Sequence, residues 1–283
     1  MKRVSIISAA VLLAACGQAP EEKAENKDEA RKEIALKPYP EVRKDSVVDD
    51  YYGTKVADPY RWLENDTSAE TAAWVKAQNE VSFDYLAQIP YRDQIRERLT
   101  ELWDYEKVGT PFKHGDYYFI YKNDGVQNQS VLYYQKGLDG TQEVLLDPNT
   151  LSDDGTASIN GMGFSKDGKY MAYGISRAGS DWVTIQVMQL DNKQMLNNKV
   201  EYVKFSGISW QKDGFYYSAY EPPKEGSDYS GKNEFHTVYY HQLGTEQSED
   251  KLIYRDGKYP LRNAGGGVTK DEEYLLISTS EST

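Results

Sequence analysis

Apolar residues recur every three or four positions early in the chain, at Trp74, Ala77, Val81, Tyr85 and Ile89. This spacing places them on one helix face, so it predicts an amphipathic helix over 68–89. Thr67 and Glu70 form a capping-box pattern at its start, and Pro90 ends it. The same spacing predicts a second helix at about 92–104, with three apolar residues that we expect in the core: Ile95, Leu99 and Leu102.

After Tyr105 the helical spacing gives way to short aromatic and β-branched runs separated by Gly, Asp and Asn. Such runs are typical of strands joined by tight turns. The 24 tyrosines favour the same structure, since Tyr suits half-buried pleated surfaces. The clearest runs are "DYYFIYKND" (116–124), "SVLYYQKG" (130–137), "EVLLD" (143–147), "VTIQVMQLD" (183–191), "HTVYYHQLG" (236–244) and "KLIYRD" (251–256).

One short phrase recurs within this region, as "FSKDGKYMAYGIS" (164–176), "SWQKDGFYYSAYE" (209–221) and "VTKDEEYLLISTS" (268–280), with a looser copy "PFKHGDYYFIYKN" (111–123). A strand follows each turn, and the turn needs a residue that tolerates positive φ. Repeats of this size, with about four short strands each, predict the blades of a β-propeller. A stacked sandwich is the alternative, but it would not predict the recurring phrase.

The composition excludes several classes of protein. The net charge is −12 and no basic stripe occurs, which argues against a nucleic-acid partner. Cys16 is the single cysteine, so neither a disulfide framework nor a cysteine-based metal site is expected.

The amino terminus predicts an export signal. Lys2 and Arg3 precede an apolar run that is too short to span a bilayer, and "LAAC" ending at Cys16 resembles a bacterial lipobox. We therefore expect a lipoprotein signal peptide over 1–16, lipidation of Cys16, and a charged tether over 17–37. This predicts a periplasmic protein that is anchored by lipid to a bacterial membrane. An ordinary secretory signal with an incidental cysteine is the alternative.

Candidate catalytic residues are sparse in the sequence. No Gly-x-Ser-x-Gly elbow occurs, and the nearest sequence, "GFSKD" (163–167), belongs to the repeat. His236 and His241 are five residues apart in a strand run, so we expect them on opposite faces, and neither they nor His114 predict a metal site. No phosphate-binding glycine loop is present either, and we expect no cofactor.

Several longer stretches resemble the prolyl oligopeptidase (prolyl endopeptidase) family, from about Tyr39 to the end of the chain. They include "YPEVRKDSVVDDYYGTKVADPYRWLE" (39–64), "NQSVLYYQ" (128–135), "LDPNTLSDDGT" (146–156), "GSDWVTI" (179–185), "VKFSGISW" (203–210) and "YYHQLGTEQSED" (239–250). The resemblance implies a mainly β fold. Residues 38–105 would form a helical segment that flanks an α/β-hydrolase domain. Residues 106–283 would form an incomplete β-propeller of three to four of seven blades.

The resemblance also implies a function. The chain would be the amino-terminal fragment of a serine endopeptidase that cleaves short peptides after proline, with the propeller gating substrate access. The catalytic Ser, Asp and His of the family belong to the carboxy-terminal hydrolase domain, so no catalytic residue is assigned in this chain. The alternative is a stand-alone, lipid-anchored binding lipoprotein of the propeller type, without enzymatic activity.

Four site residues follow from the resemblance alone. Phe205 in "VKF" corresponds to a family residue that points to the outer substrate pocket, although a blade-core aromatic is the alternative. Asn263 and Thr283 stand at pocket positions where the family has Met and Cys, so the pocket chemistry departs there. Asp181 resembles a carboxylate that faces the hydrolase domain and could meet an arginine, or it is a turn residue. Residues 221–235 are expected to form a mobile loop near the substrate route.

Overall fold

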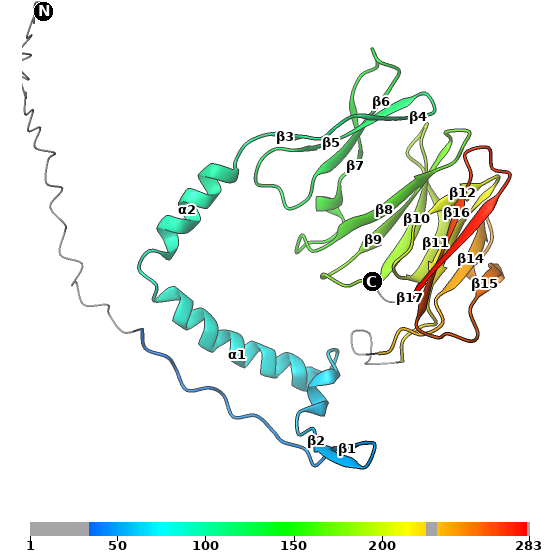
Figure 1. Ribbon diagram of the computed structural model, residues 1–283. Coiled ribbons are helices and arrows are strands. Elements are labelled where there is room, and N and C mark those ends of the chain that lie inside the picture. Colours follow the sequence, from blue (N-terminus) through cyan, green and yellow to red (C-terminus); the bar gives the residue numbers. More distant parts are fainter. Residues whose placement is uncertain (1–33, 225–230, 282–283) are drawn as a thin grey trace, which may run out of the picture.

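The computed structural model describes residues 34–224 and 231–281, and it places a helical arm beside a series of β-sheets (Figure 1). The signal peptide, Cys16, most of the tether, part of the predicted loop and Thr283 lie outside these ranges. The two predicted helices are confirmed, each to within about two residues. The early elements are β1 (Val48–Tyr51), β2 (Thr54–Ala57), η1 (Arg61–Glu64), α1 (Ala69–Ala87) and α2 (Arg92–Trp103).

The first helix begins one residue later than the capping-box pattern predicts. Ser68 is the N-cap of α1, and its hydroxyl accepts a hydrogen bond from the Thr71 amide at 3.1 Å. Thr67 instead donates to the side chain of Asn65, and Glu70 accepts from Arg43 at 2.7 Å. The expected reciprocal pair is therefore wrong, because the helix begins one residue later and the Ser68 hydroxyl caps a different amide, that of Thr71.

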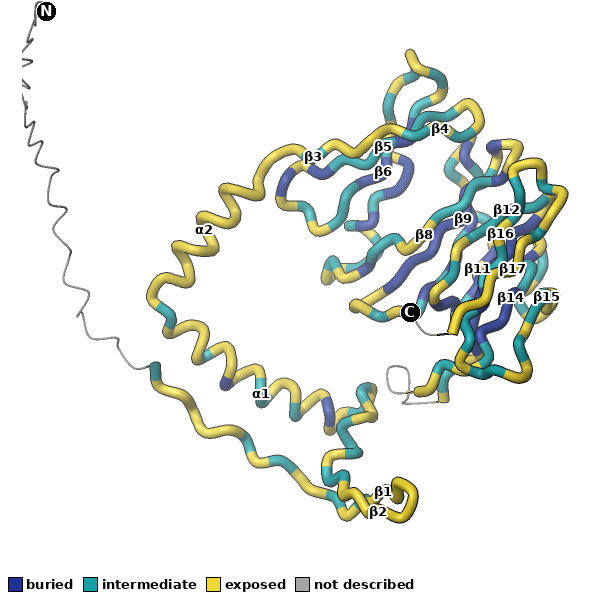
Figure 2. Tube along the Cα trace, viewed as in Figure 1, coloured by how far each residue is buried: buried dark blue, intermediate teal, exposed yellow. Residues whose placement is uncertain are grey.

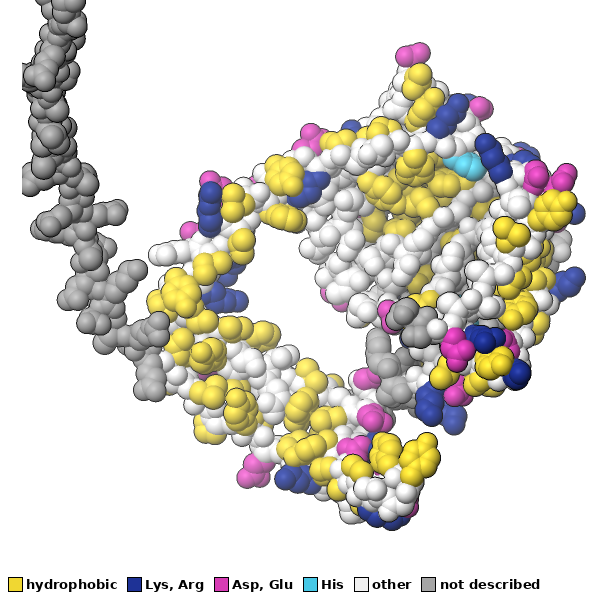
Figure 3. Space-filling view, viewed as in Figure 1, with side chains coloured by type: hydrophobic (Ala, Val, Ile, Leu, Met, Phe, Trp, Pro, Cys, Tyr) yellow, Lys and Arg dark blue, Asp and Glu magenta, His cyan; other side chains and the backbone are white. Residues whose placement is uncertain are grey.

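The expectation that the apolar face of α2 lies in the core is also wrong. Ile95, Leu99 and Leu102 are each more than half exposed, because no described element covers this face. On α1, Val81 is buried but Tyr85 is exposed. Apolar side chains are visible along the whole arm, residues 61–103, in Figure 3, and Figure 2 shows how little of it is buried. None of the described helices is both long and apolar enough to span a bilayer.

The remaining described strands form a five-stranded antiparallel sheet, an eight-stranded antiparallel sheet and a hairpin. We divide them into three blades and the first hairpin of a fourth, because a single residue pair, Val203 with Ala219, joins blades two and three. This mainly β arrangement confirms the propeller-type fold. Blade one holds β4 (Phe112–His114), β5 (Tyr117–Asn123), β6 (Val131–Lys136) and β7 (Glu143–Leu146), with β3 (Lys107–Val108) also paired to β5. Blade two holds β8 (Ser158–Phe164), β9 (Tyr170–Ser176), β10 (Val183–Gln189) and β11 (Met195–Val203). Blade three holds β12 (Ser209–Gln211), β13 (Gly214–Ala219), β14 (Thr237–Gln242) and β15 (Lys251–Arg255), and blade four begins with β16 (Arg262–Val268) and β17 (Leu275–Glu281).

The core lies between the faces of successive blades. In β9, Met171 and Tyr173 pack with blade one, whereas Ala172 packs with blade three. In β13, Phe215 packs with blade two, whereas Tyr216 packs with blade four. This alternation follows from the two-residue period of a strand, and it buries both faces of the inner blades. A strand buried on both faces explains the nearly continuous apolar runs in the sequence.

The repeated phrase forms the hairpin between the first two strands of each blade. Gly168 has φ +69°, and Glu272, at the matching position of a later copy, has φ +64°. The copy at 209–221 differs, because its two-residue turn puts the positive φ of +54° at Lys212. A side chain at Gly214 would approach the carbonyl of His241, so this glycine is required for close packing rather than for its φ.

Candidate functional site

The strand ends opposite the repeated turns bring three of the predicted site residues to one edge of the blades. Asp181 comes just before β10, Phe205 follows the end of β11, and Asn263 is the second residue of β16. Because neighbouring strands are antiparallel, these starts and ends meet at the same edge. We call this edge the distal rim. Thr283, which follows β17 in the sequence, lies outside the described residues.

Phe205 is held away from the core in a strained backbone conformation. Its side chain is 59% exposed and its φ is +52°. Positive φ is unfavourable for a bulky residue, at a cost of about 1–3 kcal/mol, so the surrounding structure must impose it. Tyr202 has φ +57° on the same strand end, where its carbonyl accepts from the Tyr220 amide at 3.3 Å. The alternative interpretation of Phe205 as a blade-core aromatic does not fit this exposure.

Between these two residues Lys204 is buried, and its ammonium group faces two aromatic rings. Its Nζ lies 4.8 Å from the ring centroid of Trp182 and 5.3 Å from that of Phe205. The same Nζ lies 3.7 Å from Oδ2 of Asp181, whose side chain is exposed. A cation over aromatic faces is favourable when it is shielded from water. The arrangement therefore joins Asp181 and Phe205, two predicted site residues, through a lysine that the sequence analysis did not single out.

Asn263, the third of these site residues, accepts a hydrogen bond from a tyrosine of blade three. The Tyr220 hydroxyl donates to Asn263 Oδ1 at 2.8 Å. Burial raises the pKa of Tyr220, which keeps this hydroxyl protonated as a donor. The Tyr220 ring stacks on His236 with a centroid distance of 4.4 Å and an interplanar angle of 19°. Asn263 is therefore one member of an ordered polar contact and not an isolated surface amide.

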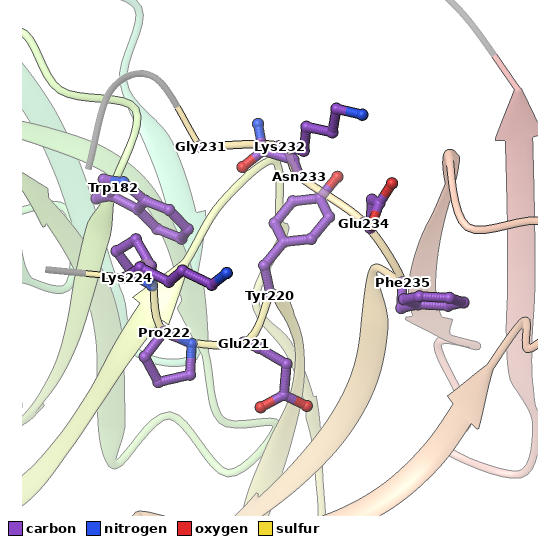
Figure 4. Close-up of a pocket in the computed structure, with 11 residues that line it drawn as sticks. Trp182, Tyr220, Glu221, Pro222, Lys224, Gly231, Lys232, Asn233, Glu234 and Phe235 are labelled. Atoms are coloured by element: carbon purple, nitrogen blue, oxygen red, sulfur yellow. The ribbon is translucent and has the colours of Figure 1, made fainter. Parts of the chain in front are cut away.

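A cavity of about 500 Å³ opens on this rim, lined by Trp182, Tyr220, Lys224 and Phe235 among others (Figure 4). In this view the Lys224 side chain runs below the ring of Trp182 and points toward Tyr220. A neighbouring cavity of about 420 Å³ is lined by Trp182 together with Thr67 of the arm. The start of α1 therefore lies over the same rim as the predicted site residues, as Figure 1 shows.

The histidines of the chain are used in the packing of the blades. His241 packs against Phe215 in the core between blades two and three, while His236 faces Ala264 of blade four, so the expected opposite orientation is confirmed. His114 lies with Nε2 2.7 Å from the Ser165 carbonyl. Among the described residues, no group of three or more His, Cys, Asp or Glu side chains is placed to hold a metal ion. These positions assign no acid–base role to any histidine.

The blades, the preceding arm and their shared rim define a β-propeller domain with an amino-terminal helical extension. Residues 39–283 match the model of the family described as "Prolyl oligopeptidase, N-terminal beta-propeller domain". The chain belongs to the prolyl oligopeptidase family. It is 50% identical to a prolyl endopeptidase of Elizabethkingia meningoseptica over 246 residues, which cover 87% of this chain and 35% of that relative. It is also 37% identical to prolyl oligopeptidase A of Amanita bisporigera, covering 36% of it.

Solved structures of the family share the architecture. One from a study of two prolyl endopeptidases matches 86% of this chain with a TM-score of 0.75 and 31% identity. Prolyl oligopeptidase B from Galerina marginata, bound to a 35mer hydrolysis and macrocyclization substrate, matches 87% with a TM-score of 0.70 and 31% identity. The chain covers 36% and 38% of these two structures. It thus corresponds to the amino-terminal propeller region of the family.

Proposed function

We propose that this chain supplies the helical arm and the propeller of a serine-type prolyl endopeptidase that acts on short proline-containing peptides. The observation that carries the proposal is the exposed, backbone-strained Phe205 on the rim that the arm also overlies. Backbone strain of this kind is concentrated at functional sites, because a strained residue persists only where the surrounding structure compensates for its energetic cost. The identity to prolyl endopeptidases adds the substrate class.

In this proposal the distal rim faces the hydrolase domain, which carries the catalytic Ser, His and Asp. Phe205 offers an aromatic surface to an apolar side chain of the peptide, next to the buried Lys204 ammonium. Asn263 lines the same outer pocket, to which the resemblance alone also assigns Thr283, and Asp181 contacts the hydrolase domain. The propeller then restricts entry, so that short peptides reach the catalytic groups and folded proteins do not.

The proposal includes a location for the enzyme. Lipidation of Cys16 would anchor it to a bacterial membrane on the periplasmic side, with the charged segment 17–37 as a tether. The apolar run and "LAAC" support this part of the proposal.

A chimera tests the proposed function. Residues 39–283 of this chain replace the matching region of the Elizabethkingia meningoseptica prolyl endopeptidase, and kcat and KM are measured on a chromogenic Gly-Pro substrate. Full burial of a Phe side chain contributes about 1.5–3 kcal/mol, and a bound peptide would cover only part of the ring, so Phe205→Ala should raise KM roughly tenfold and change kcat little. Leu252→Ala, at an exposed side chain on the outer strand β15 of blade three, is the control and should change neither constant. A folded chimera in which Phe205→Ala and Leu252→Ala behave alike would refute the role of Phe205.

A further inference from the structure

His236 is a buried histidine directly behind the segment that carries Phe205. Its side chain is 1% exposed, and both ring nitrogens have partners. The Ala264 amide donates to Nδ1 at 3.1 Å, and Nε2 lies 2.8 Å from the carbonyl oxygen of Lys204. Because an amide can only donate and a carbonyl can only accept, Nδ1 must be unprotonated and Nε2 must carry the proton. The two partners therefore define a neutral imidazole with one fixed tautomer.

The hydrogen bond from His236 acts on the peptide group that leads into Phe205. The Lys204 carbonyl belongs to the peptide bond that Lys204 makes with Phe205. Because a peptide group is planar, the hydrogen bond that holds this carbonyl also holds the whole peptide plane, and the φ of Phe205 is measured relative to that plane. That φ is +52°, a value that a Phe does not adopt without support. His236 supplies such support from inside the blades.

The other hydrogen bond connects this segment to a distant blade. Ala264 lies in β16 directly after Asn263, whereas Lys204 follows β11 of blade two. Tyr220 makes a second link between the same parts, since its ring stacks on His236 and its hydroxyl donates to Asn263. The imidazole of His236 and the phenol of Tyr220 thus link the segments that carry Phe205 and Asn263. These two rim residues are 58 positions apart in the sequence.

We propose that His236 is a positioning residue for substrate binding, which holds Phe205 and Asn263 in a fixed relative placement as a neutral two-way hydrogen-bonding bridge. Tyr220 supports this bridge from the cavity side. The inference rests on the proposed function above. A purely structural histidine would affect folding stability, but its effect on KM would not depend on the presence of the Phe205 ring.

Two substitutions in the chimera separate the hydrogen bonds of the bridge. The amide of His236→Gln can reach the place of Nε2 and donate to Lys204, while the shorter His236→Asn can accept from Ala264 but does not reach Lys204. We expect His236→Asn to raise KM about tenfold with kcat nearly unchanged, and His236→Gln to stay within about threefold of the parent. Tyr220→Phe, which removes only the hydroxyl, should raise KM by about threefold.

The decisive comparison is made with Phe205 absent. In the Phe205→Ala background, His236→Asn and Tyr220→Phe should each cause a clearly smaller rise in KM than in the parent, because of the two rim residues that they position only Asn263 is left. A rise of the same size in both backgrounds, or no rise in either, overturns the inference. If His236→Asn does not fold, the Tyr220→Phe comparison decides by the same criterion. If Phe205→Ala itself leaves KM unchanged, the proposed role of Phe205 fails first, which distinguishes the two failures.

Discussion

His241 Nδ1 lies 2.6 Å from Asp250 Oδ1, and both side chains are buried in blade three. Asn198 fixes the protonation of this pair from blade two. Its Oδ1 accepts from the Gly244 amide at 3.3 Å, so its Nδ2 donates to His241 Nε2 at 2.9 Å. A neutral His241 therefore donates its Nδ1 proton to the carboxylate, whose other oxygen accepts from the Tyr217 hydroxyl at 2.6 Å. The network joins blades two and three without any access to a substrate.

Asp250→Ala should lower the free energy of unfolding of the chain by about 3 kcal/mol, because it leaves two buried donors without an acceptor. Urea unfolding followed by tryptophan fluorescence measures this loss. Asp139→Ala, at an exposed carboxylate, is the control and should change the stability by less than about 0.5 kcal/mol. Equal effects of the two substitutions would show that the buried network contributes nothing to stability.

His236 should make the stability of the chain depend on pH. Burial lowers the pKa of its imidazole below the ordinary value of 6.5, and the Lys204 carbonyl only partly offsets this effect. Between the folded and the unfolded pKa the unfolded chain binds more protons, so stability is full above pH 6.5 and falls as the pH decreases through that window. The groups that face the ring are the Lys204 carbonyl, the Ala264 amide and Tyr220, which does not titrate in this range.

The measurement is the urea midpoint from pH 7.5 down to pH 4.5, for the parent and for His236→Gln. The parent should lose stability with a slope of up to about 1.4 kcal/mol per pH unit from this one group. The Gln variant should lack this part of the slope. Identical slopes for both proteins would contradict the assignment of a neutral His236.

The exposed apolar face of α2 should matter only when a hydrolase domain is present. Leu99 is 60% exposed, so Leu99→Lys should change the stability of this chain by less than about 0.5 kcal/mol. In the chimera, where we expect the face to be covered, the same substitution should lower the melting temperature by roughly 4 °C or more. Glu97→Lys, on the opposite side of α2, is the matched control and should be neutral in both proteins. An unaltered melting temperature of the Leu99→Lys chimera would mean that nothing covers this face.

Cys16→Ser should release the protein from the membrane fraction when it is expressed in a bacterium. The apolar run before Cys16 is too short to span the membrane, so the proposed attachment would depend on acyl chains on the cysteine. Detergent fractionation of the parent and the variant measures the difference. Membrane association of both proteins to the same extent would refute the lipid anchor.

Much of the fold could be predicted from the sequence, because strand and helix periods are local signals. The repeated phrase located the hairpins, and in two copies the same contacts recur: the hydroxyls of Ser165 and Thr269 accept from the amides of Tyr170 and Tyr274. The copy around Lys212 has the same Lys-Asp-Gly sequence but a shorter turn, and here Gly214 packs tightly against the His241 carbonyl of β14. Such an approach depends on a strand almost thirty residues away and has no local signature.

The rim was less predictable than the blades. The resemblance indicated Phe205 and Asn263, but Lys204 and His236 act through contacts between blades that only the fold creates. The sequence predicts neither a catalytic base nor a metal ligand at His236, and its two hydrogen bonds go to backbone groups that carry no sequence signal. The expected core position of Leu99 was wrong for a related reason, because helical spacing predicts an apolar face but does not say what covers it.

The proposed function requires that this chain act as the propeller region of a prolyl endopeptidase and that its distal rim face a catalytic domain. The most direct measurement is kcat/KM on a chromogenic Gly-Pro substrate for the chimera and for the purified chain alone. We expect the chimera to retain kcat/KM within about tenfold of the Elizabethkingia meningoseptica enzyme, and the chain alone to show no turnover above background, since no nucleophile, base and oxyanion hole are assigned in it. A folded but inactive chimera, or turnover by the chain alone that a serine-directed inhibitor abolishes, would contradict the claim.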